Sequence, residues 1–296
     1  MALRDVFVYH SGCLKHPSVP GHFERPERIE SILDDLGPSE IWTRMDHLEP
    51  APAPEDALLL CHTPGHVARV KEASRAGAAL DRDTFTGPGS WEAALLAAGA
   101  GLAAADALAE DRARRAFCLV RPPGHHAESD RAMGFCLFNN IAIAARHLQR
   151  RHGLARVAIV DFDAHHGNGT QEIFHEEGTV LYASTHQYPL YPGTGAASED
   201  GAGKGAGATV NCPLPAGAGL PEFTKAYREA ILPALDRFRP EVILVSAGFD
   251  AHRDDPLTRL NLATEDFGTL TRRLVEAANR HARGRVLSKL EGGYHL

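Results

Sequence analysis

A short segment, VDFDAHHGNG at 160–169, combines metal-binding and proton-transferring residue types directly after an apolar run. It holds two aspartates, two histidines and an asparagine within the eight positions from Asp161 to Asn168. The preceding residues 157–160 are Val-Ala-Ile-Val, which predicts a buried strand over 157–163. Buried strands seldom end in so many charged and polar groups, so the cluster indicates a functional site.

Three further apolar runs also end in polar clusters. In open parallel α/β sheets, ligands bind beyond the carboxyl ends of the strands. Clusters that follow four strands of one sheet are therefore expected to meet at one edge and to form a single site. The run at 117–121 leads into RPPGHH at 121–126, the run at 241–247 is followed by GFD at 248–250, and the run at 285–290 is followed by EGGY at 291–294.

Two aspartates and a histidine have the residue types of a catalytic metal site. Side chains of an extended strand alternate between its faces, so Asp161, Asp163 and His165 are expected on one side. Asp250 arrives from a separate strand and is the expected third ligand beside Asp163 and His165. Three Asp and His ligands with an open position are typical of catalytic zinc. Two carboxylates also suit Fe²⁺, Mn²⁺ or Co²⁺.

A metal with two anionic ligands activates water only moderately, so a protein base and a further electrophile are expected nearby. The candidates are His125, His126 and Tyr294. Each feature alone also has a structural explanation: an isolated Asp-x-Asp can cap a helix or pair with arginine, and the histidines and the tyrosine can pack in a core. The metal interpretation is favoured because these features occur together, in an order that lets them converge.

The arrangement of apolar runs and helical patterns predicts one α/β domain over 1–296. Several runs are apolar on both faces, which is typical of parallel strands buried between two helical layers. The expected architecture is a three-layer α/β/α fold with a central, mostly parallel sheet. Other strand candidates are 6–10, 179–185 and the segment TVNCPLP; helix candidates are 90–110, 138–151, 220–238 and 264–283, the last with Thr264 as its cap.

Composition limits the function classes. The chain has 296 residues, 44% of them hydrophobic, and a formal net charge of −7 without a block of like charges, which argues against nucleic-acid binding. Its five scattered cysteines are typical of free thiols in a reducing compartment. The segment MALRDVFVYH has no signal-peptide pattern, and the apolar segment 93–109 contains Asp106, which favours a buried helix over a membrane span. We therefore expect a cytoplasmic protein without membrane partners.

Seven stretches spread over nearly the whole chain resemble the histone deacetylase family, within the arginase–deacetylase fold. HHGNG and EGGY are similar to the class II branch and its bacterial relatives. The resemblance implies a zinc-dependent amidohydrolase that removes acetyl or other acyl groups from acyl-lysine side chains or similar amides. The matching stretches are RPERI (25–29), RPPGHHA (121–127), GFCLFNN (134–140), DFDAHHGNGT (161–170), YPGTG (191–195), SAGFDAHRDDPL (246–257) and EGGY (291–294).

The resemblance implies roles that agree with the chemistry inferred from the residue types. One zinc ion would bind water and the substrate carbonyl, and a histidine pair would move the protons. A neutral amide beside the base keeps the pKa of that base lower than a carboxylate would. The implied ligands are Asp163, His165 and Asp250, with His126 as general base, His125 as its charged partner, Asp161 as acceptor from His125, Asn168 as partner of His126, and Tyr294 as donor to the oxyanion.

The resemblance also implies a narrow acyl-lysine tunnel, a substrate-binding rim and a potassium site. It also implies that Arg28 lines an internal cavity behind the metal. As alternatives, the tunnel aromatics are ordinary core residues, the rim aspartate is a surface turn residue, and Arg28 forms a structural salt bridge. The implied positions are Gly134, Phe135 and Tyr191 in the tunnel, Asp83 at the rim, and Asp161, Asp163, His165, Ser184 and Thr185 at the potassium ion.

Other members of the fold are distinguished by single positions. Arginase-like enzymes need two metals, and their additional acidic ligands fall where this chain has Gly167 and Gly248. The eukaryotic polyamine-selective branch has an acid at the position of Leu257, so an acyl-lysine substrate is expected over an acetylpolyamine. Leu257 also has a simpler explanation as loop packing. An acetylpolyamine deacetylase stays the main alternative.

A non-catalytic binding protein with this fold is the second alternative, but it would be expected to have lost Tyr294 or a metal ligand, and none is lost. The sequence stops at Leu296, where relatives continue with a further helix. We therefore expect either a loosely held Tyr294 or a clipped version of a longer chain. The sequence leaves the oligomeric state open.

Overall fold

The computed structural model describes residues 5–296, so the first four residues of MALRDVFVYH lie outside the described residues. Its centre is an eight-stranded sheet in the order β2-β1-β3-β8-β7-β4-β5-β6, and every strand pair is parallel. The expected three-layer α/β architecture is thereby confirmed. The strands are β1 Val6–Tyr9, β2 Asp46–Leu48, β3 Arg115–Leu119, β4 Val157–Asp161, β5 Val180–Gln187, β6 Thr209–Leu214, β7 Val242–Ala247 and β8 Val286–Leu290.

The four strands that precede the polar clusters are adjacent in the sheet, in the order β3-β8-β7-β4. Because all of them run in the same direction, their carboxyl ends meet at one edge. The expectation that four clusters share one edge is therefore confirmed. β2 was not expected from the sequence, because it is only three residues long, largely exposed, and lacks an apolar run. β6 accommodates Pro213 because it lies at the border of the sheet.

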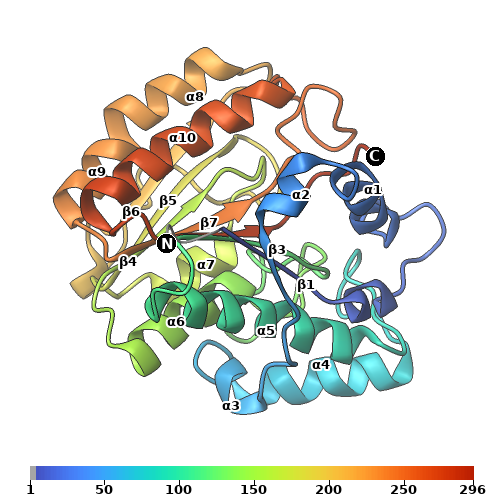
Figure 1. Cartoon of the computed structure of the whole chain (residues 1–296). Coiled ribbons are helices and arrows are strands. Elements are labelled where there is room, and N and C mark those ends of the chain that lie inside the picture. Colours follow the sequence, from blue (N-terminus) through green and yellow to red (C-terminus); the bar gives the residue numbers. More distant parts are fainter. Residues whose placement is uncertain (1–4) are drawn as a thin grey trace.

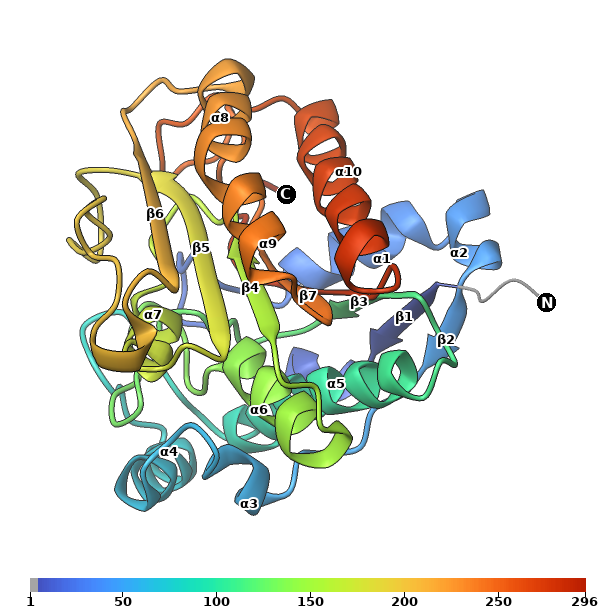
Figure 2. The same cartoon turned by 90° about the vertical axis from the view of Figure 1, so that its left-hand side faces the viewer.

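Helices cover both faces of the sheet. Figures 1 and 2 show α3 to α7 on one side, and α8 to α10 on the other with α1 and α2 beside them. Phe7 of β1 packs against Trp42 of α2, with 5.1 Å between ring centroids. The helices are α1 Glu27–Leu36, α2 Glu40–Arg44, α3 Glu55–Leu58, α4 Pro64–Ala76, α5 Ser90–Ala109, α6 Asn140–His152, α7 Asn168–Phe174, α8 Leu220–Ala226, α9 Leu232–Phe238 and α10 Thr264–His281.

Two expected helices differ in detail from the structure. The helix expected at 220–238 is divided by a π-helical turn, Tyr227–Ile231, which ends two residues before Pro233. Proline has no N–H and its ring clashes with the carbonyl four residues earlier, so regular α-helical bonding cannot pass this point. The expected capping by Thr264 is wrong. Ala263 is the N-cap of α10, and the Asp266 carboxylate accepts its N–H at 2.8 Å.

The apolar helix α5 meets the length and composition criteria for a membrane span, yet 67% of that window is buried inside the protein. Its small residues permit close packing: a Cβ at Gly99 would overlap the Ala51 carbonyl, and one at Gly101 would lie 3.0 Å from Lys289 Nζ. Burial against the sheet and α6 therefore accounts for the composition of α5, as expected from the sequence.

A buried ion-pair cluster joins the N-terminal segment to the segment after β3. Arg121 donates from Nε and Nη2 to Glu24 at 2.5 and 2.7 Å, and Arg28 Nη1 donates to the same carboxylate at 3.2 Å. All three side chains are at most 2% exposed. Burial by itself would raise the pKa of Glu24, but the charge and hydrogen bonds of Arg121, together with the charges of His16 and Arg28, lower it to about 2.

We expect Glu24→Gln to destabilise the fold by about 3–5 kcal/mol, because the two buried guanidinium groups lose their counter-charge. Urea unfolding at neutral pH measures this. Because the pKa of Glu24 is depressed, its stabilisation is full above pH 4.5 and declines as the pH falls toward 2. The unfolding free energies of the wild type and Glu24→Gln should therefore converge in acid. Glu55→Gln, in the exposed pair with Lys71, is the control and should change stability little. Equal effects of both substitutions would contradict the prediction.

Candidate active site

The end of β4 turns sharply and does not continue as an extended strand. β4 ends at Asp161, and residues 162–166 lie outside any strand. Asp161 Oδ1 accepts the N–H of Asp163 at 3.1 Å, and Asp163 Oδ1 accepts the N–H of His165 at 2.9 Å. The predicted extension of this strand to Asp163 is therefore wrong, and alternation between strand faces does not orient Asp163 and His165. Aspartate side chains that bond the backbone two residues later shape this segment.

The structure brings Asp163, His165 and Asp250 together. Their potential ligand atoms all lie within 4.8 Å of one another. His165 Nδ1 is 2.8 Å from Asp250 Oδ2 and 3.2 Å from Asp163 Oδ1. A Cβ at Gly248 or Gly292 would collide with these carboxylates, so both positions require glycine.

The chemistry of this group fits one divalent ion. The two aspartates are at most 1% exposed. Burial, followed by the negative charge of Asp163, raises the pKa of Asp250 to about 7. Two buried carboxylates in contact are unfavourable unless a cation neutralises them. Two carboxylate oxygens and one imidazole nitrogen are suitable ligands for zinc and for other divalent transition metals.

His125 and His126 lie next to this group in opposite electrostatic environments. His125 Nδ1 donates to Asp161 Oδ2 at 3.0 Å, and its Nε2 is 3.8 Å from Asp163 Oδ2. Burial opposes a charge on His125, but the charges of Asp163 and Asp161 prevail and raise its pKa to about 10. Burial and then the positive charge of His125 hold the pKa of His126 well below 6.5. The pair therefore consists of one charged and one neutral imidazole.

Asn168 sets the tautomer of His126. The amide Nδ2 of Asn168 donates to Glu128 Oε1 at 2.7 Å, which directs its Oδ1 toward His126. His126 Nδ1 lies 2.8 Å from this oxygen and must be the donor. The Nε2 atom of neutral His126 consequently carries the free lone pair.

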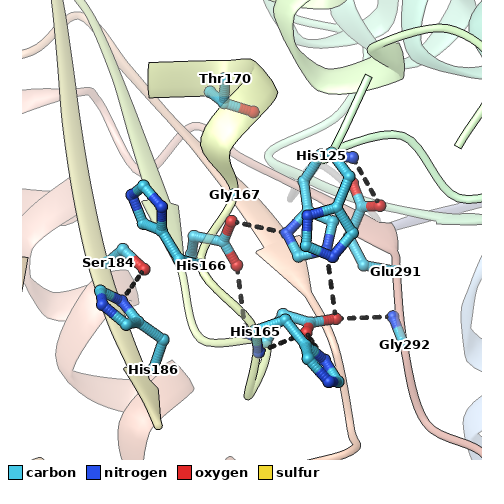
Figure 3. A network of polar contacts seen from close by, with 12 residues as sticks. His125, His165, His166, Gly167, Thr170, Ser184, His186, Glu291 and Gly292 are labelled. Carbon is cyan, nitrogen blue, oxygen red and sulfur yellow. Dashed lines mark hydrogen bonds and ion pairs between the residues drawn. The ribbon is translucent and has the colours of Figure 1, made fainter. Parts of the chain in front are cut away.

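Two groups at the end of β8, to which the sequence reasoning gave no role, fix the loop after β3. The buried Glu291 Oε2 accepts the N–H groups of Gly124 at 2.6 Å and of His125 at 3.1 Å. The N–H of Gly292 donates to Asp163 Oδ2 at 2.8 Å. Figure 3 shows His125, His165 and Gly292 gathered around one carboxylate, with Glu291 beside His125. The position of Glu291 directly after a buried strand was the available signal.

Tyr294 is held from two sides and is only 8% exposed. Its N–H donates to Asp255 Oδ2 at 2.8 Å, a contact that the sequence reasoning did not foresee. Arg28 lies with its guanidinium 4.7 Å from the centre of the Tyr294 ring, and its Nε donates to the Gly293 carbonyl at 2.7 Å. Arg28 also pairs with Glu24, so it forms the salt bridge that was one of the two expectations for it.

A cavity of about 250 Å³ opens next to His126 and His165. Tyr191, at its mouth, is 39% exposed and packs edge-on against His126 at 5.2 Å, so it is no core aromatic. Phe135 packs edge-on against Tyr294 at 5.8 Å. All of the positions expected in the tunnel and at the rim line this cavity: its lining residues are Asp83, His126, Gly134, Phe135, His165, Leu190, Tyr191, Leu257 and Tyr294.

The residues implied for potassium are neighbours on β4 and β5. Asp161 and Ser184 are register partners in the sheet. Ser184 Oγ is 2.8 Å from His186 Nδ1, so its hydroxyl already has a partner. Figure 3 marks this contact with a dashed line. The buried Thr185 Oγ1 has no hydrogen-bond partner among the described residues.

Comparisons with protein families, curated sequences and solved structures all give deacetylases. Residues 22–296 match the histone deacetylase domain family. The chain is 44% identical to a probable deacetylase of Archaeoglobus fulgidus, over 98% of this chain and 81% of that protein. It is 40% identical to human polyamine deacetylase HDAC10, over 92% of this chain and 42% of that protein. The crystal structure of the HDA15 HD domain superposes with a TM-score of 0.95 at 36% identity, over 99% of this chain and 85% of that one.

Proposed function

Because the chain belongs to the histone deacetylase family, we propose that residues 1–296 form one catalytic domain that hydrolyses the amide of acyl-lysine side chains. One arrangement carries the proposal: the metal-ligand group, a neutral histidine and a tyrosine meet at a single cavity. Hydrolysis of an amide needs an activated water, a donor to the oxyanion and a proton for the leaving amine. The residues around this cavity can supply these functions.

Zinc is the metal that we propose for Asp163, His165 and Asp250, with Fe²⁺, Mn²⁺ and Co²⁺ as alternatives, because the three side chains offer one nitrogen and two oxygens. Bound there, the ion would polarise the substrate carbonyl and make water more acidic. Every other step is assigned to side chains of the protein.

His126 acts as general base and then as general acid. It is neutral because burial and the charged His125 lower its pKa, so it can accept a proton from water. Its Nδ1 is occupied by Asn168, so the proton moves to Nε2. The same imidazole then passes this proton to the leaving lysine amine. Asp163 and Asp161 keep His125 in its charged form.

Tyr294 donates a hydrogen bond to the oxyanion. Burial raises the pKa of its hydroxyl well above 10, so the group keeps its proton at neutral pH. Asp255 and Arg28 hold the residue from both sides, which keeps the donor in place before the substrate arrives. Phe135 and Tyr191 would pack along the lysine stem and exclude water.

The cavity supports acyl-lysine over acetylpolyamine as substrate. Leu190 and Leu257 line it without offering a charge to a second ammonium group. Asp83, also at the lining, would accept an N–H of a peptide backbone. An acetylpolyamine is the second candidate, because human HDAC10, a relative at 40% identity, is named a polyamine deacetylase and because Asp81 and Asp83 provide negative charge.

A potassium ion and a cytoplasmic location complete the proposal. The potassium ligands would be Ser184, Thr185 and the carbonyl groups of Asp161, Asp163 and His165; the unpartnered Thr185 hydroxyl supports a ligand there. All five cysteines are free, as suits a reducing compartment.

We expect the purified protein to retain about one metal ion per chain after dialysis against metal-free buffer. Asp163→Ala and Asp250→Ala should each abolish this retention, because two ligands do not hold the ion. Elemental analysis measures the content. Asp254→Ala, on the same loop with a 60% exposed side chain, is the matched control and should keep the metal. Full retention by the Asp250→Ala protein would refute the ligand assignment.

Tyr294→Phe should reduce kcat on an acetyl-lysine peptide by about 10²–10³, with metal content unchanged, because the oxyanion loses a preorganised donor. Tyr9→Phe, which removes a hydroxyl from β1, is the control and should leave kcat unaltered. A Tyr294→Phe enzyme with normal turnover would exclude the tyrosine from the reaction. No turnover by the wild-type protein on any acyl-lysine or acetylpolyamine would overturn the proposed function.

Wild-type protein should have a higher kcat/KM for acetyl-lysine peptide than for acetylspermidine. Leu257→Glu should shift this ratio toward acetylspermidine by about fivefold, because one nearby opposite charge is worth on the order of 1 kcal/mol at a wet surface. Leu257→Gln has the same shape without the charge and should leave the ratio close to that of the wild type. A wild-type preference for acetylspermidine would reverse the substrate assignment.

A further inference from the structure

A second group of two histidines and a carboxylate lies where α5 and α6 end, outside the active-site cavity. Asp106 is in the last turn of α5, His147 is on α6, and His152 is the last residue of α6. The Nε2 atoms of His147 and His152 are 2.7 and 2.6 Å from the same oxygen, Asp106 Oδ1. The potential ligand atoms of all three residues lie within 4.8 Å of one another.

The electrostatic environment of this group favours a cation. The last turns of two helices meet here, and the exposed carbonyl groups of a helix C-terminus carry partial negative charge. Asp106 adds a full negative charge at the end of α5, where the helix dipole disfavours it. Nearby positive charge comes from Arg151, whose Nε is 3.7 Å from Asp106 Oδ1, but its side chain is 64% exposed and free to move away.

The geometry and accessibility suit a divalent transition metal. Both imidazoles point Nε2 at one carboxylate oxygen, so their lone pairs converge once the hydrogen bonds are released. Ligand atoms around tetrahedral zinc are about 3.3 Å apart, given metal–ligand distances of about 2.0–2.1 Å. The side chains need only a small outward movement to reach this spacing. They are 14–28% exposed, so an ion can enter from solvent and a water can complete its shell.

We propose that Asp106, His147 and His152 bind a zinc-class divalent cation that joins the C-terminal turns of α5 and α6. The same contacts can exist without metal, as two imidazole N–H groups donating to one carboxylate. Added zinc distinguishes the two states. The stability of a protein with only the hydrogen-bonded cluster does not change, whereas a protein with a metal site becomes more stable against unfolding. The proposal is independent of the catalytic function, because its ligands share no residue with the active site.

The test uses the dialysed holoenzyme with its retained metal. Titration with Zn²⁺ should show uptake of about one further ion per chain, together with a rise in Tm of a few degrees. Co²⁺ should give the visible absorption of a cobalt ion with imidazole ligands. Asp106→Asn and His152→Gln should each abolish the additional uptake and the Tm rise, while far-UV circular dichroism verifies their fold. Asp250→Ala should retain both responses, which separates this site from the active site.

Arg151→Gln is the matched control on the same helical turn. It removes a nearby positive charge and keeps all three ligands, so it should bind the added zinc at least as tightly as the wild type. No further uptake by the wild-type protein would overturn the proposal. Undiminished uptake by both Asp106→Asn and His152→Gln would do the same, because the added ion would then lie elsewhere.

Discussion

The burial of several carboxylates at one edge of the sheet is the constraint on which the rest of the site depends. Asp161, Asp163, Asp250 and Glu291 are all at most 1% exposed. An uncompensated buried charge is costly, so each group must find a cation or several donors. His125 supplies positive charge between two of them, while the N–H groups of Gly124, His125 and Gly292 occupy further oxygens. The remaining excess of negative charge is what makes a divalent metal fit.

The same constraint explains how two adjacent histidines acquire different protonation states. His125 contacts the carboxylates and becomes charged, while burial and then the charge of His125 keep neighbouring His126 neutral. A neutral amide, Asn168, faces His126 where a carboxylate would have raised its pKa. The surroundings of the pair thus leave one imidazole charged and the other neutral, which is the state that the proposed general base needs.

Local patterns in the sequence were sufficient for the parts of the protein that depend on local chemistry. Apolar runs that end in polar clusters identified the strands around the site and the candidate metal ligands, because burial and chemistry act on consecutive residues. Contacts between distant segments left no such pattern. Glu24 with Arg121, and Asp255 with Tyr294, are polar pairs whose partners only the fold identifies. The turn after Asp161 was also mistaken for a continuing strand, because alternation alone cannot detect a side chain that bonds its own backbone.

The position of β8 has a consequence for how the protein is made. Of the eight strands in the described part of the chain, β8 is the last in sequence, yet it lies between β3 and β7 in the middle of the sheet. While a ribosome is still synthesising the preceding residues, the strand groups β2-β1-β3 and β7-β4-β5-β6 have no direct pairing with each other. Until β8 is made, β3 and β7 each have one strand edge without a pairing partner. These apolar edges are exposed to chaperones or to other chains until β8 inserts between them.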